Sequence, residues 1–266
     1  MARNNFLASF NRMALVTTHN WRTCHRHVPT SIWLHILHLT CSLRSILTIS
    51  DHSSLDAAVV AVSESIASVM QFEIKRVDVE CIGEIDTMVD DTDAAIVVAG
   101  IGGGYSVQRY LNAFRSLRIP YLFVKQHNTS FAPQRIILPV TNLMEDREKG
   151  PYASSFARHY YAPITIVKPR DYGSQAQANI DAMITLFDSL SVRHEVQNAR
   201  RDSSKVEREA LKFSNPDTPE LLIISASRDY GLDDIIFGPK ERSTIRHSAM
   251  PVLVINPRAD LYPLCD

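Results

Sequence analysis

One pattern of residues occurs twice in this chain, and the two copies are separated by about half of the sequence. In the first copy, the apolar run 94–100 leads through a helical stretch to a second apolar run at 120–124. In the second copy, the run 221–225 leads through a helical stretch to 251–255. A repeat of this length is typical of two like domains in tandem and excludes a solenoid of short repeats.

Short apolar runs alternate with helical patterns in each half, which is typical of parallel strands joined by crossover helices. The sequence predicts five strands in each half, and residues 14–18 and 136–140 open the two halves in the same way. The predicted strands are 13–18, 44–50, 72–79, 94–99 and 120–125 in the first half, and 135–140, 163–168, 192–197, 220–225 and 251–256 in the second.

The segment between the halves, residues 126–134, is polar and contains Pro133. Polar, proline-containing segments are typical of domain boundaries. We therefore expect the two domains at 1–130 and 134–266. Within the second half, helices are predicted at 152–160, around 180–187, and in a short segment that ends near 215–216, for which Ser203 and Ser204 are N-cap candidates.

Composition narrows the class of protein. The chain has 266 residues, of which 45% are apolar, so it can bury two cores of ordinary size. Its net charge of -1 provides no electrostatic footprint for nucleic acid. No apolar run approaches the length of a membrane span, and the N-terminus lacks the apolar stretch of a leader. We expect a soluble cytoplasmic protein without nucleic-acid or membrane partners.

The four cysteines are irregularly spaced and form no CxxC pair, which suits free thiols in a reducing compartment. Cys81 is expected to be a buried small hydrophobic residue. Cys265 is expected to be an exposed thiol.

The order of predicted elements, and above all the ending Thr-Ile-Arg-His-Ser-Ala-Met-Pro-Val-Leu-Val-Ile at 244–255, resembles the universal stress protein domain, present here as a tandem pair. The resemblance extends over nearly the whole chain and is strongest at 220–256. It implies two Rossmann-like domains of the adenine nucleotide alpha hydrolase-like type. Each would be a five-stranded parallel sheet in the order 3-2-1-4-5, flanked by helices. In such a sheet, ligands bind where the loops after strands 1 and 4 meet.

Nucleotide-binding members of that family carry the motif G-x2-G-x9-G-[ST] after strand 4, where glycine amides can approach phosphates. In the second half the four motif positions are Ser225, Arg228, Gly238 and Pro239. Pro239 has neither an amide hydrogen nor a hydroxyl group. Thr141 stands where an acidic residue would face the adenine. The resemblance therefore implies that the second half does not bind ATP in the ordinary way.

The first half departs from the motif differently. Gly100 and Gly103 keep its first two glycines, and Gly104 adds a further one. The stretch from this turn to the next strand is shorter than its counterpart, and the missing residues are those that would carry the rest of the motif. Thr18 ends the predicted first strand, and His19 stands where the adenine-facing acid would be. We interpret the run as a glycine-rich turn between strand and helix, without a bound cofactor.

Histidines are concentrated near the N-terminus, with two cysteines close by. They are His19, His25, His27, His35 and His38, with Cys24 and Cys41. Imidazole and thiolate groups suit zinc or copper, but this spacing matches no closed metal site. His35 and His38 fit the polar edge of an amphipathic helix equally well. We predict no metal site, so chelators should leave the melting temperature unchanged.

The sequence predicts no catalytic residue, because no G-x-S-x-G elbow, HExxH motif or P-loop follows a predicted strand. The resemblance implies a non-enzymatic stress-response protein that acts through protein contacts or an unknown ligand. The alternative is a nucleotide or anion sensor with a rebuilt phosphate pocket. There Arg228, Lys240 and Arg242 would replace backbone amides.

The last predicted strand of each half is apolar, and an apolar sheet edge favours pairing with another strand. Universal stress domains commonly dimerise through this strand. The resemblance therefore implies that the two last strands pair antiparallel within the chain. A homodimer and an unidentified protein partner both stay open.

Overall fold

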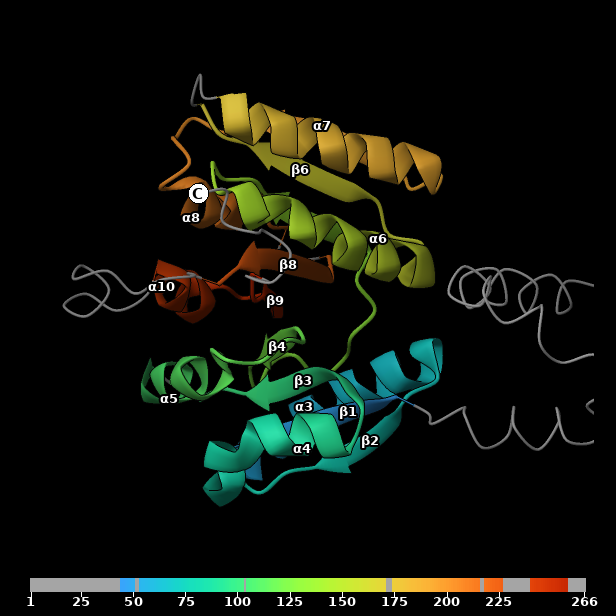
Figure 1. Ribbon diagram of the computed structural model, residues 1–266, viewed down its shortest axis with the longest axis vertical. Helices are drawn as coiled ribbons and strands as arrows, with labels where there is room; N and C mark the ends of the chain where they lie inside the picture. The colour runs from blue at the N-terminus through green and yellow to red at the C-terminus, as the bar shows by residue number, and fades with distance from the viewer. Residues whose placement is uncertain are drawn as a thin grey trace, which may run out of the picture. The chain divides into compact units, whose positions relative to one another are not determined.

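Nine strands of one sheet organise the part of the chain that the computed structural model describes, which is residues 44–50, 53–102, 104–170, 174–215, 218–226 and 240–257 (Figure 1). All of them belong to one compact unit, Leu43–Asp266. The strands are β1 (Ser45–Ser50), β2 (Glu73–Arg76), β3 (Ala94–Gly100), β4 (Tyr121–Val124), β5 (Arg135–Pro139), β6 (Ile164–Lys168), β7 (His194–Asn198), β8 (Glu220–Ser225) and β9 (Val252–Ile255). Each overlaps a strand predicted from the sequence. The predicted strand 13–18 and the histidines at 19–38 lie outside the described residues.

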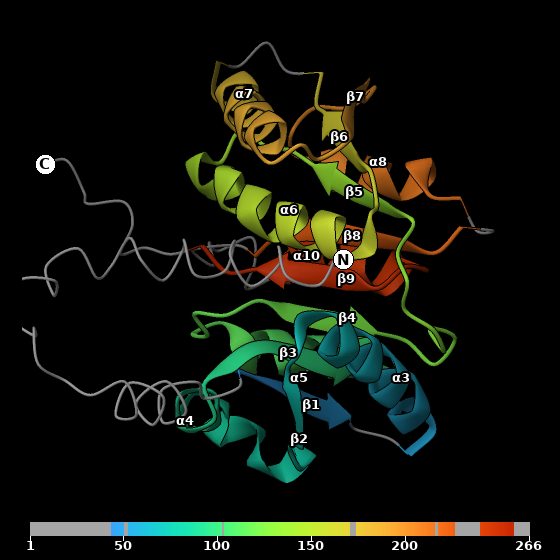
Figure 2. The same cartoon turned by 90° about the vertical axis from the view of Figure 1, so that its right-hand side faces the viewer.

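Helices connect most of these strands. They are α3 (Ser53–Met70), α4 (Ile85–Asp91), α5 (Gly104–Phe114), α6 (Lys149–Tyr160), α7 (Ser174–Ser189), α8 (Val206–Ala210) and α10 (Lys240–His247), with 3-10 helices η1 (Val79–Glu84), η2 (Met144–Glu148) and η3 (Leu211–Phe213). The strand order is β2-β1-β3-β4-β9-β8-β5-β6-β7, and Figure 2 shows the strands following one another in this order. All neighbours are parallel except β4 and β9, which are antiparallel.

The second half of the sheet is built around β5, which lies between β6 and β8. From β7 to β9 the order reads 3-2-1-4-5 when the strands are counted from β5. The carboxyl ends of β5 and β8 therefore lie side by side.

The first half differs from the prediction in one respect. We expected the strand 13–18 between 44–50 and 94–99, but β1 pairs directly with β3 through six residue pairs. The other edge of β1 pairs with β2, and the other edge of β3 pairs with β4. The predicted placement of 13–18 is therefore wrong, because no free edge remains there. An apolar run indicates a strand, but its neighbours are set by hydrogen bonds between distant segments.

Side chains from each strand reach both faces of the sheet, as expected for parallel strands covered on two sides. One face packs against α3, α6 and α7, with Val62, Phe156 and Phe187 in its core. The other packs against α4, α5, α8 and α10, with Phe114 and Ile245 in its core. Both cores contain residues from each half of the chain, so the packing on each face of the sheet continues from one half into the other.

The halves meet at β4 and β9, with Leu122 opposite Leu253 in the antiparallel register. Both leucines are fully buried. Asn256 extends the contact, since its Oδ1 accepts a hydrogen bond from the Tyr121 hydroxyl at 3.1 Å. Its Nδ2 donates to the carbonyls of Phe114 at 2.7 Å and Leu117 at 2.8 Å, at the end of α5. The two last strands, which the resemblance implies to be partners, thus lie side by side.

The segment 126–134 is polar in sequence but is held in place by both halves. Phe131 is buried and packs edge-on against Tyr160, with ring centroids 5.4 Å apart, and against Phe156 at 6.2 Å. Its carbonyl accepts a hydrogen bond from the Ser65 hydroxyl on α3. The segment that the sequence indicates as a domain boundary is therefore packed against both halves of the fold.

Two local predictions are wrong. The N-cap of α8 is Lys205, without a side-chain cap, because Ser204 donates from its amide and hydroxyl to Asp202 Oδ1 at 3.1 and 2.5 Å. The Ser203 hydroxyl donates to Asn142 instead. Cys81 is exposed rather than buried, since η1 lies at the surface and buries only Ile82.

Among the described helices, α3 is long and apolar enough to cross a membrane. Its buried residues, which include Leu55, Val59, Val62 and Ile66, pack in the protein core. A core helix passes the same test of length and composition, and we interpret α3 as one.

Candidate ligand-binding site

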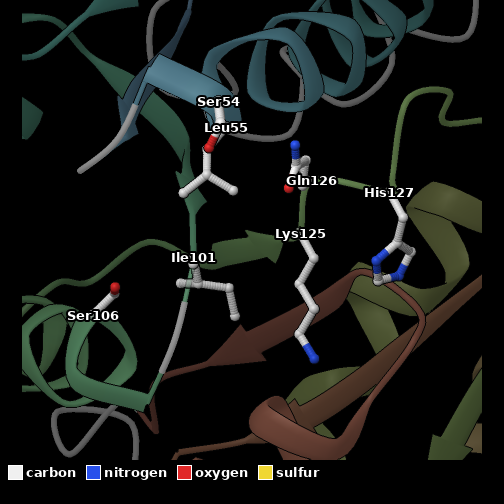
Figure 3. A pocket seen from close by; sticks show the side chains of 8 residues that line it. Ser54, Leu55, Ile101, Ser106, Lys125, Gln126 and His127 are labelled. Atoms are coloured by element: carbon white, nitrogen blue, oxygen red, sulfur yellow. The ribbon is translucent and has the colours of Figure 1, made fainter.

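The carboxyl ends of β1 and β3 form a point where the strand order reverses, because the chain continues to β2 on one side and to β4 on the other. Open α/β sheets bind ligands at such points. A cavity of about 500 Å³ lies there (Figure 3). We call it the first-half cleft, and its lining residues are Ser54, Leu55, Ile101, Gly102, Ser106, Lys125, Gln126 and His127.

The electrostatics of the first-half cleft favour negative charge. Ser54 lies in the first turn of α3 and Ser106 in the first turn of α5. The exposed amides and dipole of a helix N-terminus attract anions. Lys125 and His127, which follow β4, add basic groups, and none of the described lining residues is acidic.

An ion-paired carboxylate, that of Asp56, directly follows the lining residues Ser54 and Leu55 in the sequence. Asp56 on α3 accepts hydrogen bonds from the Ser50 hydroxyl and from Arg76 Nη2, the latter at 2.7 Å. The Ser50 hydrogen bond, followed by that of Arg76, holds the pKa of Asp56 below its ordinary value. This carboxylate is therefore ionised and already partnered.

Gly100 is the last residue of β3 and packs against α3. A Cβ atom at this position would lie 2.8 Å from Val59 Cγ2 and 3.0 Å from Leu55 Cβ. Glycine is thus required for the close approach of helix and strand beside the cleft. Gly100 stands at the first glycine of the family's phosphate motif, in a run that we interpreted as a turn without a cofactor, and its contacts give it a packing role.

We predict that Gly100→Ala lowers the free energy of unfolding by about 1–3 kcal/mol, because the added methyl group overpacks the contact with α3. Urea denaturation measures the loss. Gly83→Ala is the matched control, since a Cβ there has no neighbour within 4 Å. Equal stability of the two variants would contradict the packing role of Gly100.

The corresponding point in the second half, between β5 and β8, is filled by a buried ion pair. Asp146 and Lys149 have side chains that are 0% exposed, and Lys149 Nζ lies 2.9 Å from Asp146 Oδ2. The same carboxylate accepts hydrogen bonds from the Thr141 amide at 2.5 Å and from the Ser225 hydroxyl at 2.6 Å. Lys149 Nζ also donates to the Pro139 carbonyl at 2.5 Å. We call these five residues the Asp146 network.

The Asp146 network is tied to the loop after β5 by a residue of α7. Asn179 Nδ2 on α7 donates to the carbonyls of Thr141 at 3.2 Å and Leu143 at 2.7 Å, which holds the loop after β5 in place. Thr141 and Ser225 are each 8% exposed. The protein's own side chains thus occupy the point where the carboxyl ends of β5 and β8 meet.

Gly100 and Ser225 hold corresponding positions in the two halves. Gly100 pairs with the last residue of β4, and Ser225 pairs with the last residue of β9. The prolines before these two strands also match, since Pro120 and Pro251 each accept a backbone hydrogen bond of 3.1 Å from the neighbouring strand. Gly100 and Ser225 are therefore equivalent in strand register.

The remaining predicted site residues are placed only in part. Gly104 begins α5, and Thr141 and Ser225 belong to the Asp146 network. Outside the described residues lie Thr18, His19, Gly103, Arg228 and Gly238. The reason for choosing His19 no longer holds, because β1 and not 13–18 lies beside β3.

Sequence reasoning missed Asp146 and Lys149. Their one signal was a pair of opposite charges three residues apart at the start of a helical pattern, which more often indicates a solvated face. Within the described ranges, no group of three histidine, cysteine or acidic side chains is arranged to hold a metal ion.

Comparison with known proteins shows which solved structures share this fold. No family model and no curated protein matches the sequence. A universal stress protein from Archaeoglobus fulgidus is similar in structure, with a TM-score of 0.59 at 12% identity over 81% of this chain and 97% of that one. A putative universal stress protein from Pseudomonas aeruginosa has a TM-score of 0.50 at 13% identity over 81% and 94%.

A protein of unknown function from Pseudomonas aeruginosa also has a TM-score of 0.50, at 11% identity over 88% of this chain and 89% of that one. The mixed α/β sheet described above therefore has the fold of universal stress proteins.

Proposed function

We propose that the chain is a non-enzymatic tandem universal stress protein that binds a ligand smaller than ATP in the first-half cleft. Its second site is closed. The observation that carries this proposal is the contrast between the two strand-order reversals. One opens into a cavity of about 500 Å³, and the other holds the Asp146 network, whose ion pair is fully buried.

The tandem arrangement is supported by the matching positions of β3-α5-β4 and β8-α10-β9. The alignments to solved structures also cover 81% or more of the chain, which is more than either half. In this proposal the domains are 1–130 and 134–266, and the second is a five-stranded domain with the order 3-2-1-4-5. They share the sheet through β4 and β9. A cytoplasmic role in a stress response remains part of the proposal.

The size of the ligand follows from the turn after β3. Because α5 begins at Gly104, three residues separate it from Gly100, and no room remains for the long segment that carries the rest of the family's phosphate motif. The acid that the family places after strand 1 would be Asp51, which follows β1 in the sequence. A compact adenine-type ligand can then be recognised without amides for a triphosphate.

We expect nucleotide-free protein to bind ATP no more tightly than about 0.1 mM, or about −5.5 kcal/mol, in a calorimetric titration. AMP or adenosine should bind more tightly than ATP. Gly102→Leu, which adds side-chain volume in the cleft, should abolish this binding, and the exposed Gly83→Leu should not. Binding that ignores Gly102→Leu would refute the assignment of the cleft.

The alternative, a sensor with a rebuilt second pocket, has one observation in its favour. Arg242 Nε on α10 is buried and has no hydrogen-bond partner among the described residues, and an anion could satisfy such a donor. Lys240 begins the same helix. Micromolar ATP affinity that disappears in Arg228→Ala would favour this alternative over the first-half cleft.

A further inference from the structure

Lys125 connects the first-half cleft to the second half of the chain. It follows β4 and borders the cleft (Figure 3). Its Nζ donates to the carbonyl of Arg246 at 2.8 Å and to that of Ser248 at 2.6 Å, at the end of α10. A cation at a helix C-terminus satisfies free carbonyls and interacts favourably with the helix dipole. One side chain therefore serves both the cleft and α10.

The residues after Lys125 strengthen this contact. His127 Nε2 lies 2.7 Å from the Ala249 carbonyl, and Asn128 Nδ2 donates to the same oxygen at 3.2 Å. Asn128 Oδ1 in turn accepts a hydrogen bond from the Lys125 backbone amide at 2.8 Å. We call the contacts of residues 125–128 with residues 246–249 the clasp. It joins the wall of the cleft to the turn between α10 and β9.

Among the described residues, the partners of the Lys125 ammonium group are neutral carbonyls. It is half-buried, desolvation lowers its pKa, and no ion pair in the described part of the chain involves it. Two of its three hydrogens are accounted for by the carbonyls of Arg246 and Ser248. A cation that is partly removed from water and has only neutral partners is costly, and an anion beside it offsets that cost.

We infer that Lys125 receives the phosphate group of a ligand in the first-half cleft and that this binding tightens the clasp on α10. The inference rests on the proposed function, because it names the ligand class of the same cleft. A phosphate that accepts the third hydrogen holds the ammonium where it meets the two carbonyls. Coupling of this kind is reciprocal, so a tighter clasp also favours the bound anion.

Hydrogen exchange of the full-length protein tests the clasp. The informative amides are Ser248, which donates to the Thr244 carbonyl, and Met250, which donates to the Ser248 hydroxyl. Without ligand, Lys125→Met should speed their exchange about two- to fivefold, the factor expected for a lost cation at a helix C-terminus. The exposed Lys212→Met is the control and should leave the rates unchanged. Unchanged rates in Lys125→Met would overturn the clasp.

The ligand arm compares inorganic phosphate, AMP and adenosine. Slower exchange with inorganic phosphate and AMP, absent in Lys125→Met, supports the inference and shows that phosphate alone suffices. If exchange slows with AMP but not with inorganic phosphate, the inference is supported for a phosphate ester. Binding of adenosine that is lost in Gly102→Leu, with no Lys125-dependent effect of phosphate or AMP, overturns the inference but leaves the proposed function intact. If none of the three binds, both fail.

Discussion

Asp146→Asn should lower the free energy of unfolding by about 3–5 kcal/mol, the cost of leaving a buried charge without its partner. Lys149 is 0% exposed, so its ammonium cannot turn to water when the carboxylate is removed. The Thr141 amide and the Ser225 hydroxyl would also lose a charged acceptor. Linear extrapolation of urea denaturation measures this loss.

Two further variants separate charge from packing. Asp146→Leu combined with Lys149→Met should recover most of the stability, because a buried ion pair can be replaced by apolar residues of similar size. Arg76→Ala, which breaks a pair with side chains 65% and 31% exposed, should cost at most about 1 kcal/mol. A loss in Asp146→Asn no larger than that of Arg76→Ala would show that the second half is open to water.

Residues 1–130 and 134–266, expressed separately, should aggregate or self-associate, and should regain solubility when they are co-expressed. Separation exposes the hydrogen-bonding edges of β4 and β9 together with Leu122 and Leu253, and unpaired apolar edges favour intermolecular pairing. Both cores are also cut, since each contains residues from the two halves. Size-exclusion chromatography with light scattering measures the masses.

The control for this experiment is the intact chain, which should remain soluble under the same conditions. Co-expressed halves should elute together with the mass of one copy of each. Two stable monomeric halves with no affinity for each other would show that the shared sheet is not needed for folding.

If the first-half cleft is open and the second site is closed, the halves have different tasks. In this proposal the Asp146 network is structural, and the clasp would pass the state of the cleft to α10. Such a division suits a protein that reports a small ligand through a change on its surface.

Local sequence was sufficient to locate the strands. The runs at 94–99 and 221–224 are apolar throughout because both faces of these strands are covered by helices, and this burial leaves a direct trace in composition. The prolines at 120 and 251 and the small residues at 100 and 225 mark the same points in each half. The repeat is therefore evident from the amino-acid sequence alone.

The neighbours of each strand are not evident in the same way. The run 44–50 was predicted as a strand. Its pairing with β3 joins residues that are almost 50 positions apart in the sequence, since Ser45 lies opposite Ala94. His19 was chosen because 13–18 was expected beside 94–99, a place that β1 holds. A position next to a strand acquires a role only when the place of that strand in the sheet is known.

The two sites show most clearly which features local sequence determines and which features depend on tertiary contacts. Glycines, prolines and apolar runs act through local backbone geometry and burial, so their pattern determines the fold class and the repeat. Asp146, Lys149 and Lys125 are ordinary charged residues in the sequence. Whether such a charge is solvated, paired inside the protein or left facing a cleft depends on which distant groups surround it, and only the folded chain brings those groups together.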